Sequence, residues 1–263
     1  MDKEFTILIN SCKKFSDMWE NVLLLFDKYW PNHPEIIILS DEPDERRNIK
    51  NVLAINGEMS DRLIKVTDSI KTKYLFLSFD DYYPYKNIDD SKIRQIIDLM
   101  ENDNLDYCRI FNEEKVKGKK IKPLKYQNMP LTKTYEVNFY PSIWKVESFK
   151  KVMKPKETIW KAEARITRRA KEQELKCICI DKSVFPHKDI VRKGKYLRSA
   201  YKFLRKNDLF ISDRQVRSAK ETLQLNTQIF VSRHAPKCLK EKIKNRLRKK
   251  GKVFYSDYAE TDD

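Results

Sequence analysis

Two adjacent carboxylates, Asp80 and Asp81, follow the apolar run expected to be a strand at residues 73–77, after Ser78 and Phe79. Neighbouring carboxylates repel each other, so a cation or hydrogen-bond donors must stabilise the pair if both stay ionised. An acid pair at the end of a buried parallel strand suits a divalent cation together with a diphosphate. The alternative is a turn that also caps the helix expected from Asp89. The pair therefore predicts either a phosphate-binding site or that turn.

Three further polar residues would complete such a site. Ser11 and Asp41 each end an expected strand. Asp41 would accept hydrogen bonds from ribose hydroxyls or a uracil edge, although its place before Pro43 also suits a turn. Arg62 lies in an expected helix, where its guanidinium would bind diphosphate oxygens or else be an exposed helix charge.

A second group of candidates comes later in the chain. His187 and Lys195 follow an expected strand at 175–180 and would reach a leaving diphosphate, although a lone His is more often structural. Tyr140 and Trp144 would stack on the apolar C–H face of a sugar, because aromatic rings bury such surfaces well. Core packing explains the same two residues equally well.

The elements around these candidates alternate between strand-like and helix-like patterns. Strands that are apolar throughout, separated by amphipathic helices, predict an α/β fold with a mostly parallel sheet covered on both faces. Ligands of such sheets bind at the carboxyl ends of the strands, where Ser11, Asp41 and Asp80 fall. Apolar runs predict strands at 5–9, 35–39, 51–55, 73–77 and 175–180, and apolar spacings of three and four predict helices at 15–29, 61–69, 146–153 and 159–173.

Composition excludes several classes of protein. The 263 residues are 40% hydrophobic and 36% charged, which allows one large domain, or one domain with an appendage. The longest apolar runs fall far short of the ~20 residues of a membrane-spanning helix, and the first residues lack the apolar stretch of a secretory signal. Five Cys without CxxC spacing fit a reduced, cytosolic compartment, and only three His argue against a structural zinc site.

The net charge of +16 is concentrated in one region. Residues 182–252 hold 22 Lys and Arg against 5 Asp and Glu, whereas residues 1–181 hold 33 against 30. A basic region of this kind fits nucleic acid, an anionic membrane face or an anionic substrate, or is simply a solvated helix face.

Short motifs in order along the chain resemble nucleotide-sugar-dependent glycosyltransferases of the GT-A fold. The resemblance is closest to small bacterial enzymes of surface and capsular polysaccharide assembly, and it covers roughly residues 4–200. A first block holds Ser60-Asp61-Arg62-Leu63, Thr72-Lys73-Tyr74 and Asp80-Asp81-Tyr82; a second holds Tyr135-x-x-Asn138, Ile143-Trp144, Trp160-x-x-Glu163, His187 and Lys193-Gly194-Lys195.

The resemblance implies a nucleotide-diphospho-sugar donor, most simply a UDP-sugar, and a saccharide acceptor. It implies that Glu163 is the general base and that Trp160, with Tyr140 and Trp144, lies on the acceptor side. Glu163 would otherwise be a surface residue paired with neighbouring Lys or Arg. The usual Asp-x-Asp motif is here Asp80-Asp81-Tyr82, so Asp81 alone would hold Mg²⁺ or Mn²⁺, or the enzyme would need no metal.

The last part of the chain is expected to be a basic helical extension, residues 196–263, after a catalytic domain at 1–195. Within it, residues 237–252 place Leu239, Ile243 and Leu247 at helical spacing among many Lys and Arg. That composition is typical of a helix lying on an anionic membrane. It suits a cytoplasmic enzyme bound peripherally to the inner face of the plasma membrane, with a lipid-linked oligosaccharide as acceptor.

Two alternatives remain open. The basic third favours a nucleic-acid-binding protein, yet the sequence has no helix-turn-helix glycine, RNP motif or zinc spacing, so no nucleic-acid partner is expected. A non-catalytic partner in polysaccharide assembly would keep the fold without the activity, because a fold does not imply a function.

Overall fold

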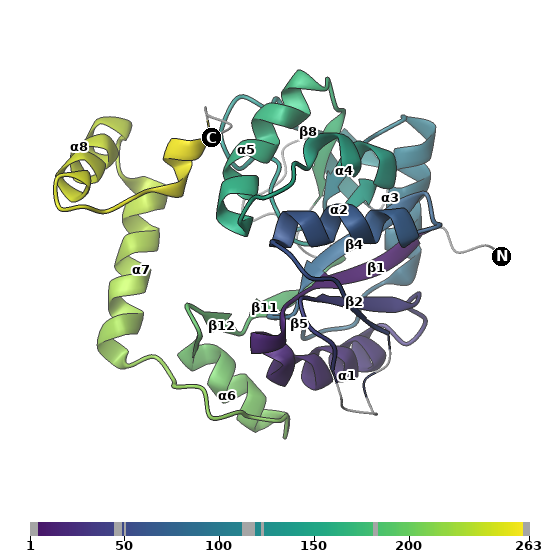
Figure 1. Ribbon diagram of the computed structural model, residues 1–263, viewed down its shortest axis with the longest axis horizontal. Helices are drawn as coiled ribbons and strands as arrows, with labels where there is room; N and C mark the ends of the chain where they lie inside the picture. Colours follow the sequence, from purple (N-terminus) through teal and green to yellow (C-terminus); the bar gives the residue numbers. More distant parts are fainter. Residues whose placement is uncertain are drawn as a thin grey trace. The chain divides into compact units, whose positions relative to one another are not determined.

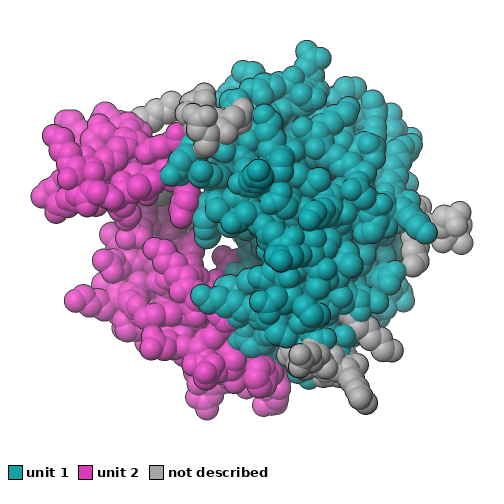
Figure 2. Space-filling model, viewed as in Figure 1, with its two compact units in different colours: residues 1–188, 258–263 teal, residues 189–257 magenta. Residues whose placement is uncertain are grey.

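The computed structural model describes residues 5–44, 49, 51–111, 119–121, 124–180 and 184–259 (Figure 1). It has two compact units (Figure 2): Met1–Lys188 with Tyr258–Asp263, and Asp189–Asp257. The domain division expected from the sequence, after residue 195, remains a prediction, and residues 260–263 of the expected extension lie outside the described residues.

A nine-stranded sheet forms the centre of the first unit, in the order β3-β2-β1-β4-β9-β6-β10-β8-β7. The strands from β3 to β4 are parallel, as are β6 and β10, whereas β9 runs antiparallel between β4 and β6. The predicted mostly parallel sheet is confirmed. The strands span Val52–Ala54 (β3), Ile36–Ser40 (β2), Phe5–Asn10 (β1), Tyr74–Phe79 (β4), Ser142–Lys145 (β9), Tyr107–Arg109 (β6), Cys177–Ile180 (β10), Leu124–Asn128 (β8) and Lys119–Ile121 (β7).

The three central parallel strands end together. They are nearly continuous runs of Phe, Ile and Leu because both faces of the sheet are covered. In the register of the sheet, Asn10 of β1 lies beside Leu39 of β2 and Phe79 of β4. The residues that follow β1, β2 and β4 therefore meet at one border, which we call the carboxyl edge.

Three helices cover one face of the sheet. Their apolar side chains share a core with Leu8, Leu75 and Leu77, which point to this face because side chains alternate along a strand. These helices are α2 (Met59–Ser69), α4 (Val146–Val152) and α5 (Ile159–Glu172).

The opposite face packs against a second helical layer, which confirms helices on both faces. Phe5 and Phe76 point to this side and pack on Trp30, with ring centroids 6.0 and 5.6 Å apart. The Trp30 indole N–H donates to Asp90 at 3.0 Å and so joins the two helices of the layer. These are α1 (Trp19–Tyr29), which follows the short 3-10 helix η1 (Lys13–Met18), and α3 (Asp90–Asn102).

The acid pair forms a turn. β4 ends at Phe79, and Asp80 and Asp81 turn the chain into β5 (Tyr82–Pro84). The expectation that this turn would also cap the next helix is wrong. Asp89 itself caps α3, because it accepts a hydrogen bond from the backbone N–H of Ser91. The pair therefore turns the chain at the carboxyl edge without capping a helix.

The second unit confirms the predicted helical extension. It holds 20 Lys and Arg against 6 Asp and Glu. Across the described part of the chain, no helix is both long enough and apolar enough to cross a membrane. The second unit begins with a hairpin of β12 (Val191–Arg192) and β13 (Lys195–Tyr196). The helices α6 (Arg198–Lys206), α7 (Ala219–His234) and α8 (Lys237–Arg248) follow. The 3-10 helix η3 (Tyr255–Tyr258) comes last, and its final residue belongs to the first unit.

Candidate functional site

The carboxyl edge brings Ser11, Asp41 and Asp80 together, as the sequence predicts for the ends of parallel strands. The Ser11 hydroxyl donates to the Asp80 carboxylate. The indole N–H of Trp19 donates to the Ser11 oxygen at 2.6 Å. Because the Ser11 oxygen accepts from the indole, the hydroxyl proton of Ser11 points to Asp80. Asp80 is thus held at the carboxyl edge, where it is only 6% exposed.

Asp41 is held ionised beside Arg62. It accepts a hydrogen bond from the backbone N–H of Lys13 at 2.6 Å, and its Oδ1 lies 3.7 Å from Nη1 of Arg62. Burial opposes ionisation of Asp41, but the Lys13 N–H and the charge of Arg62 outweigh it and lower the pKa of the carboxyl below its usual value. Asp41 thus presents a charged acceptor at the carboxyl edge.

Arg62 is a buried cation with unused donors. The residue is 6% exposed, so the alternative of an exposed helix charge is wrong. Among the described residues, its Nε and Nη1 have no hydrogen-bond partner. Buried polar groups are nearly always hydrogen-bonded, and leaving one unsatisfied costs about 1–3 kcal/mol. The buried guanidinium beside Asp41 is therefore a candidate for binding an anion.

Cys12 lies among these charges. Burial raises the pKa of its thiol, the negative charges of Asp80 and Asp41 raise it further, and Arg62 opposes them. The thiol is therefore kept protonated and is a poor nucleophile. Asp41, Asp80 and Arg62 therefore all lie near this one thiol.

Asp81 is the residue predicted to hold a metal, and that assignment stays a prediction. In the described part of the chain, no group of three or more His, Cys, Asp or Glu side chains could hold a metal ion. Mg²⁺ is usually bound by one or two carboxylates together with substrate phosphates. Asp81 is half-buried and next to the buried Asp80. It therefore fits a metal that is shared with substrate phosphates rather than one bound by protein side chains alone.

Glu163 lies on α5, one turn after Trp160. It accepts a hydrogen bond from the backbone N–H of Phe139 at 3.3 Å, and burial raises the pKa of its carboxyl. Among the described residues it has no ion pair: Arg165 is paired with Glu157 instead. Glu163 is therefore a desolvated carboxylate, and the alternative of a surface ion pair is wrong.

The predicted acceptor residues have different environments. Tyr140 is half-buried at the start of β9, near Tyr82 and Phe111, with ring centroids 6.2 and 5.5 Å away. Trp160 is 52% exposed, and its role stays a prediction. Trp144 is completely buried against Tyr107, 4.4 Å between centroids, so the prediction that it stacks on a sugar is wrong.

The two residues predicted to reach the leaving diphosphate lie in different units. His187 belongs to the first unit and contacts Tyr82, which follows the acid pair, with ring centroids 4.8 Å apart. Lys195 belongs to the second unit, where it donates to Glu221 at 2.9 Å. The assignment of Lys195 stays a prediction.

Sequence reasoning missed three residues near these candidates. Trp19 falls in the helix expected at 15–29, and nothing in the spacing of that helix marks its bond to Ser11. Tyr82 is only the third place of the Asp80-Asp81-Tyr82 motif. Phe111 follows β6, and its position beside Tyr140 and His187 depends on pairing between distant strands.

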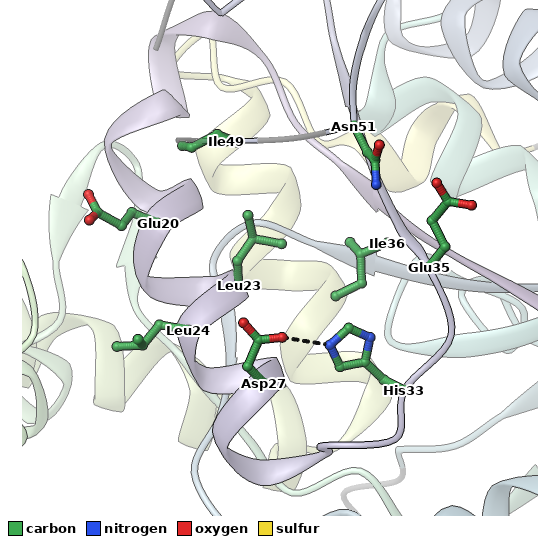
Figure 3. Close-up of a pocket in the computed structure, with 9 residues that line it drawn as sticks. All are labelled: Glu20, Leu23, Leu24, Asp27, His33, Glu35, Ile36, Ile49 and Asn51. Carbon is green, nitrogen blue, oxygen red and sulfur yellow. Dashed lines mark hydrogen bonds and ion pairs between the residues drawn. The ribbon is translucent and has the colours of Figure 1, made fainter. Parts of the chain in front are cut away.

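A pocket of about 450 Å³ lies elsewhere (Figure 3). Glu35 and Asn51 precede β2 and β3, so the pocket lies at the amino ends of these strands, opposite the carboxyl edge. Its three acids disfavour a diphosphate, and it contains none of the predicted site residues. It is lined by Glu20, Leu23, Leu24, Asp27, His33, Glu35, Ile36, Ile49 and Asn51.

No protein-family model matches the chain, and no curated protein matches it at a significant level. Residues 1–349 of S. aureus TarS are similar at 13% identity and a TM-score of 0.47, over 70% of this chain and 59% of that one. A further S. aureus TarS structure is 10% identical, with a TM-score of 0.48, over 70% and 36%.

Glucosyl-3-phosphoglycerate synthase from Mycobacterium tuberculosis, solved with Mn²⁺ and UDP-glucose, is 7% identical, with a TM-score of 0.43, over 80% of this chain and 81% of that one. The chain thus spans 59% and 36% of the two TarS chains. With TM-scores below 0.5, these likenesses do not bear on function.

Proposed function

We propose that this protein is a glycosyltransferase that moves a sugar from a UDP-sugar to a saccharide acceptor. The observation that carries the proposal is Arg62, whose buried guanidinium lies beside Asp41 and has two donors without a hydrogen-bond partner among the residues that the structure describes. A diphosphate oxygen would accept a charge-assisted hydrogen bond from this guanidinium, because phosphate is a strong acceptor for arginine donors. The ionised Asp41 beside it would accept from ribose hydroxyls or the uracil edge.

The other residues of the edge would serve the leaving group. Ser11 and Trp19 hold the Asp80 carboxylate in place. Asp81 would bind Mg²⁺ or Mn²⁺, which when bound supplies positive charge to the departing diphosphate. His187, near the acid turn through Tyr82, would donate a hydrogen bond to the same group.

Glu163 would act as the general base in an inverting transfer. A base must remove the proton of the acceptor hydroxyl as that oxygen attacks the anomeric carbon. The raised pKa of the buried Glu163 carboxyl makes it a stronger proton acceptor than an exposed glutamate. The proton would move to Glu163 while the bond between the anomeric carbon and the diphosphate oxygen breaks.

We place the reaction at the inner face of a membrane, in the assembly of a surface polysaccharide. Helix α8 has exposed Leu239 and Ile243 among Lys and Arg, which supports reversible attachment to anionic lipid. The acceptor would then be a lipid-linked oligosaccharide.

The test is UDP release from UDP-glucose, UDP-galactose and UDP-N-acetylglucosamine by the wild type and two variants. We expect Asp81→Ala and Glu163→Gln to lower turnover, whereas Glu172→Gln, an exposed position on the same helix, leaves it unchanged. Unchanged turnover in both site variants would remove the site assignment. UDP binding without turnover would favour a non-catalytic partner.

The basic second unit favours one other candidate, a nucleic-acid-binding protein. It predicts tight duplex binding that weakens steeply with salt. Such binding at physiological salt, in a protein that does not bind UDP, would replace the glycosyltransferase proposal.

A further inference from the structure

Four half-buried aromatic rings contact one another beside the acid turn, and we call them the aromatic quartet: Tyr82, Phe111, Tyr140 and His187. Successive centroids are 4.8 Å apart from Tyr82 to His187, 4.4 Å on to Phe111, 5.5 Å on to Tyr140 and 6.2 Å back to Tyr82. The ring planes meet at 48° to 72°, the tilted and edge-to-face arrangements that aromatic pairs prefer.

The topology of the sheet assembles the quartet at the carboxyl edge. Tyr82 follows β4 and Phe111 follows β6, both of which end at this edge. Because β9 runs antiparallel between them, its start lies beside their ends: Ser142 pairs with Leu77 of β4 and with Arg109 of β6. Tyr140, just before β9, therefore meets the other rings. The polar candidates follow β1, β2 and β4, whereas Tyr82 and Phe111 of the quartet follow β4 and β6 and Tyr140 precedes β9.

The spacing of the rings decides what they could bind. A cation held in an aromatic cage lies within about 6 Å of the surrounding ring centroids, so the rings must stand apart around it. Here the rings touch one another and fill the space between them. Their exposed parts instead offer an apolar surface with polar atoms at its margin, from two phenols and one imidazole. A sugar ring has the matching shape, with C–H groups on a face and hydroxyls around its rim.

The quartet also connects the two parts of the proposed chemistry. Tyr82 directly follows Asp81, on the donor side. Tyr140 directly follows Phe139, whose N–H donates to Glu163 at 3.3 Å. The quartet is thus linked to both sides through residues next to Tyr82 and Tyr140. The proposed chemistry needs an acceptor hydroxyl between the donor and the base, where it can attack and lose its proton.

We propose that the aromatic quartet binds the terminal sugar ring of the acceptor through its apolar C–H face. This inference rests on the proposed function for the role of the sugar as acceptor. It adds Phe111 and Tyr82 to the residues that recognise the substrate.

The test is saturation-transfer NMR on the full chain with methyl glycosides of glucose, galactose and N-acetylglucosamine, with and without UDP. Phe111→Leu keeps apolar volume and removes a ring, and Phe210→Leu, at an exposed phenylalanine of the second unit, is the matched control. We expect at least one glycoside to bind the wild type and the control, and to bind Phe111→Leu about two- to ten-fold more weakly. If Phe111→Leu does not fold, Tyr140→Leu replaces it.

Three results would overturn the inference while leaving donor binding intact. The UDP-bound protein could give no glycoside signal, or Phe111→Leu could give the same glycoside signal as the wild type. The third is a Phe111→Leu variant that loses the uracil signals of UDP but keeps the glycoside signals. If UDP does not bind but a glycoside does, and Phe111→Leu weakens it, the quartet stands as a sugar site and the proposed function fails.

Discussion

Arg62 is a charge that the fold buries without satisfying its hydrogen bonds. Replacing such a charge by an apolar side chain of similar length removes two unsatisfied donors from the interior. The carboxylate partner, Asp41, is 39% exposed and lies 3.7 Å away, so losing that pair costs little. Residues kept for ligand binding are often unfavourable for stability in the free protein.

We therefore expect Arg62→Met to raise the free energy of unfolding of the ligand-free protein by about 1 kcal/mol. Urea denaturation of the wild type and the variant measures this change. Lys65→Met, at an exposed position of the same helix, serves as control and should change stability by less than about 0.5 kcal/mol. A destabilised Arg62→Met would mean that the guanidinium is already satisfied.

Glu163 should make both the stability and the turnover of the protein depend on pH. Burial raises the pKa of its carboxyl, so the folded protein holds the proton at pH values where the unfolded chain has lost it. Stability should therefore fall as pH rises from the ordinary glutamate pKa through the raised folded value. As a base, Glu163 must be ionised, so turnover should rise with pH through that folded value.

Glu163→Gln should abolish that rise and lower turnover by about 10²- to 10⁴-fold. The same variant should be more stable than the wild type at pH values above the folded pKa, because it no longer buries a charge. A pH–rate profile and urea denaturation at several pH values measure both effects. A profile that the variant leaves unchanged would exclude Glu163 as the base.

At the scale of elements, a buried ion-pair cluster joins the start of α5 to α2. Glu157, just before the helix, accepts from Arg165 at 2.7 Å and from Arg169 at 2.6 Å. Its backbone N–H donates to the Ser60 hydroxyl of α2 at 2.8 Å. Burial opposes ionisation of Glu157, but the two arginines outweigh it and lower the pKa of the carboxyl. The cluster positions the helix that carries Glu163.

Glu157→Gln should lower the free energy of unfolding by about 3–5 kcal/mol, because it leaves buried guanidinium charges without their counter-ion. Glu172→Gln breaks an exposed pair with Arg168 on the same helix and should cost less than about 1 kcal/mol. The cluster should also lose its contribution to the free energy of unfolding as pH falls below the ordinary glutamate pKa. The Glu157 carboxyl is protonated in the unfolded chain at a higher pH than in the folded protein. Equal effects of the two variants would contradict a buried cluster.

The order of the elements from β1 to β4, and the places of α4, α5 and β10, could be predicted because local patterns carry them. The strand expected at 73–77 is β4, and the helix expected at 159–173 is α5, which ends one residue earlier. The carboxyl-edge position of Ser11, Asp41 and Asp80 followed from that order alone. These features depend on residues close together in sequence.

The rest depends on contacts between distant segments. Trp144 has the same local signature whether it packs in a core or faces a sugar. It is buried because β9 inserts between β4 and β6 beneath α4, where Phe149 packs on it with centroids 5.1 Å apart. The burial of Arg62 likewise follows from how α2 lies on the sheet. No spacing in the sequence distinguishes these cases.

At the scale of the whole molecule, most of the excess positive charge belongs to the second unit, whereas most of the candidate site residues lie in the first. Each basic residue near an anionic membrane contributes about 1 kcal/mol. We expect the protein to bind phosphatidylglycerol vesicles at low salt and to be released at about 1 M salt, where the Debye length is about 3 Å.

Vesicle co-sedimentation with Leu239→Glu and Ile243→Glu tests whether α8 is the contact. These variants should bind more weakly, and Leu223→Glu, at an exposed position of α7, should bind as the wild type does. If the protein binds phosphatidylcholine vesicles as strongly as phosphatidylglycerol vesicles, the attachment is not electrostatic.

The most direct measurement is calorimetric titration of UDP, with and without Mn²⁺, into the wild type, Arg62→Met and Lys65→Met. If the carboxyl edge binds a diphosphate through Arg62, the wild type and Lys65→Met bind alike. Arg62→Met then binds about 30-fold more weakly, equivalent to about 2 kcal/mol. A wild type that does not bind UDP, or an Arg62→Met variant that binds it as tightly, would contradict the account.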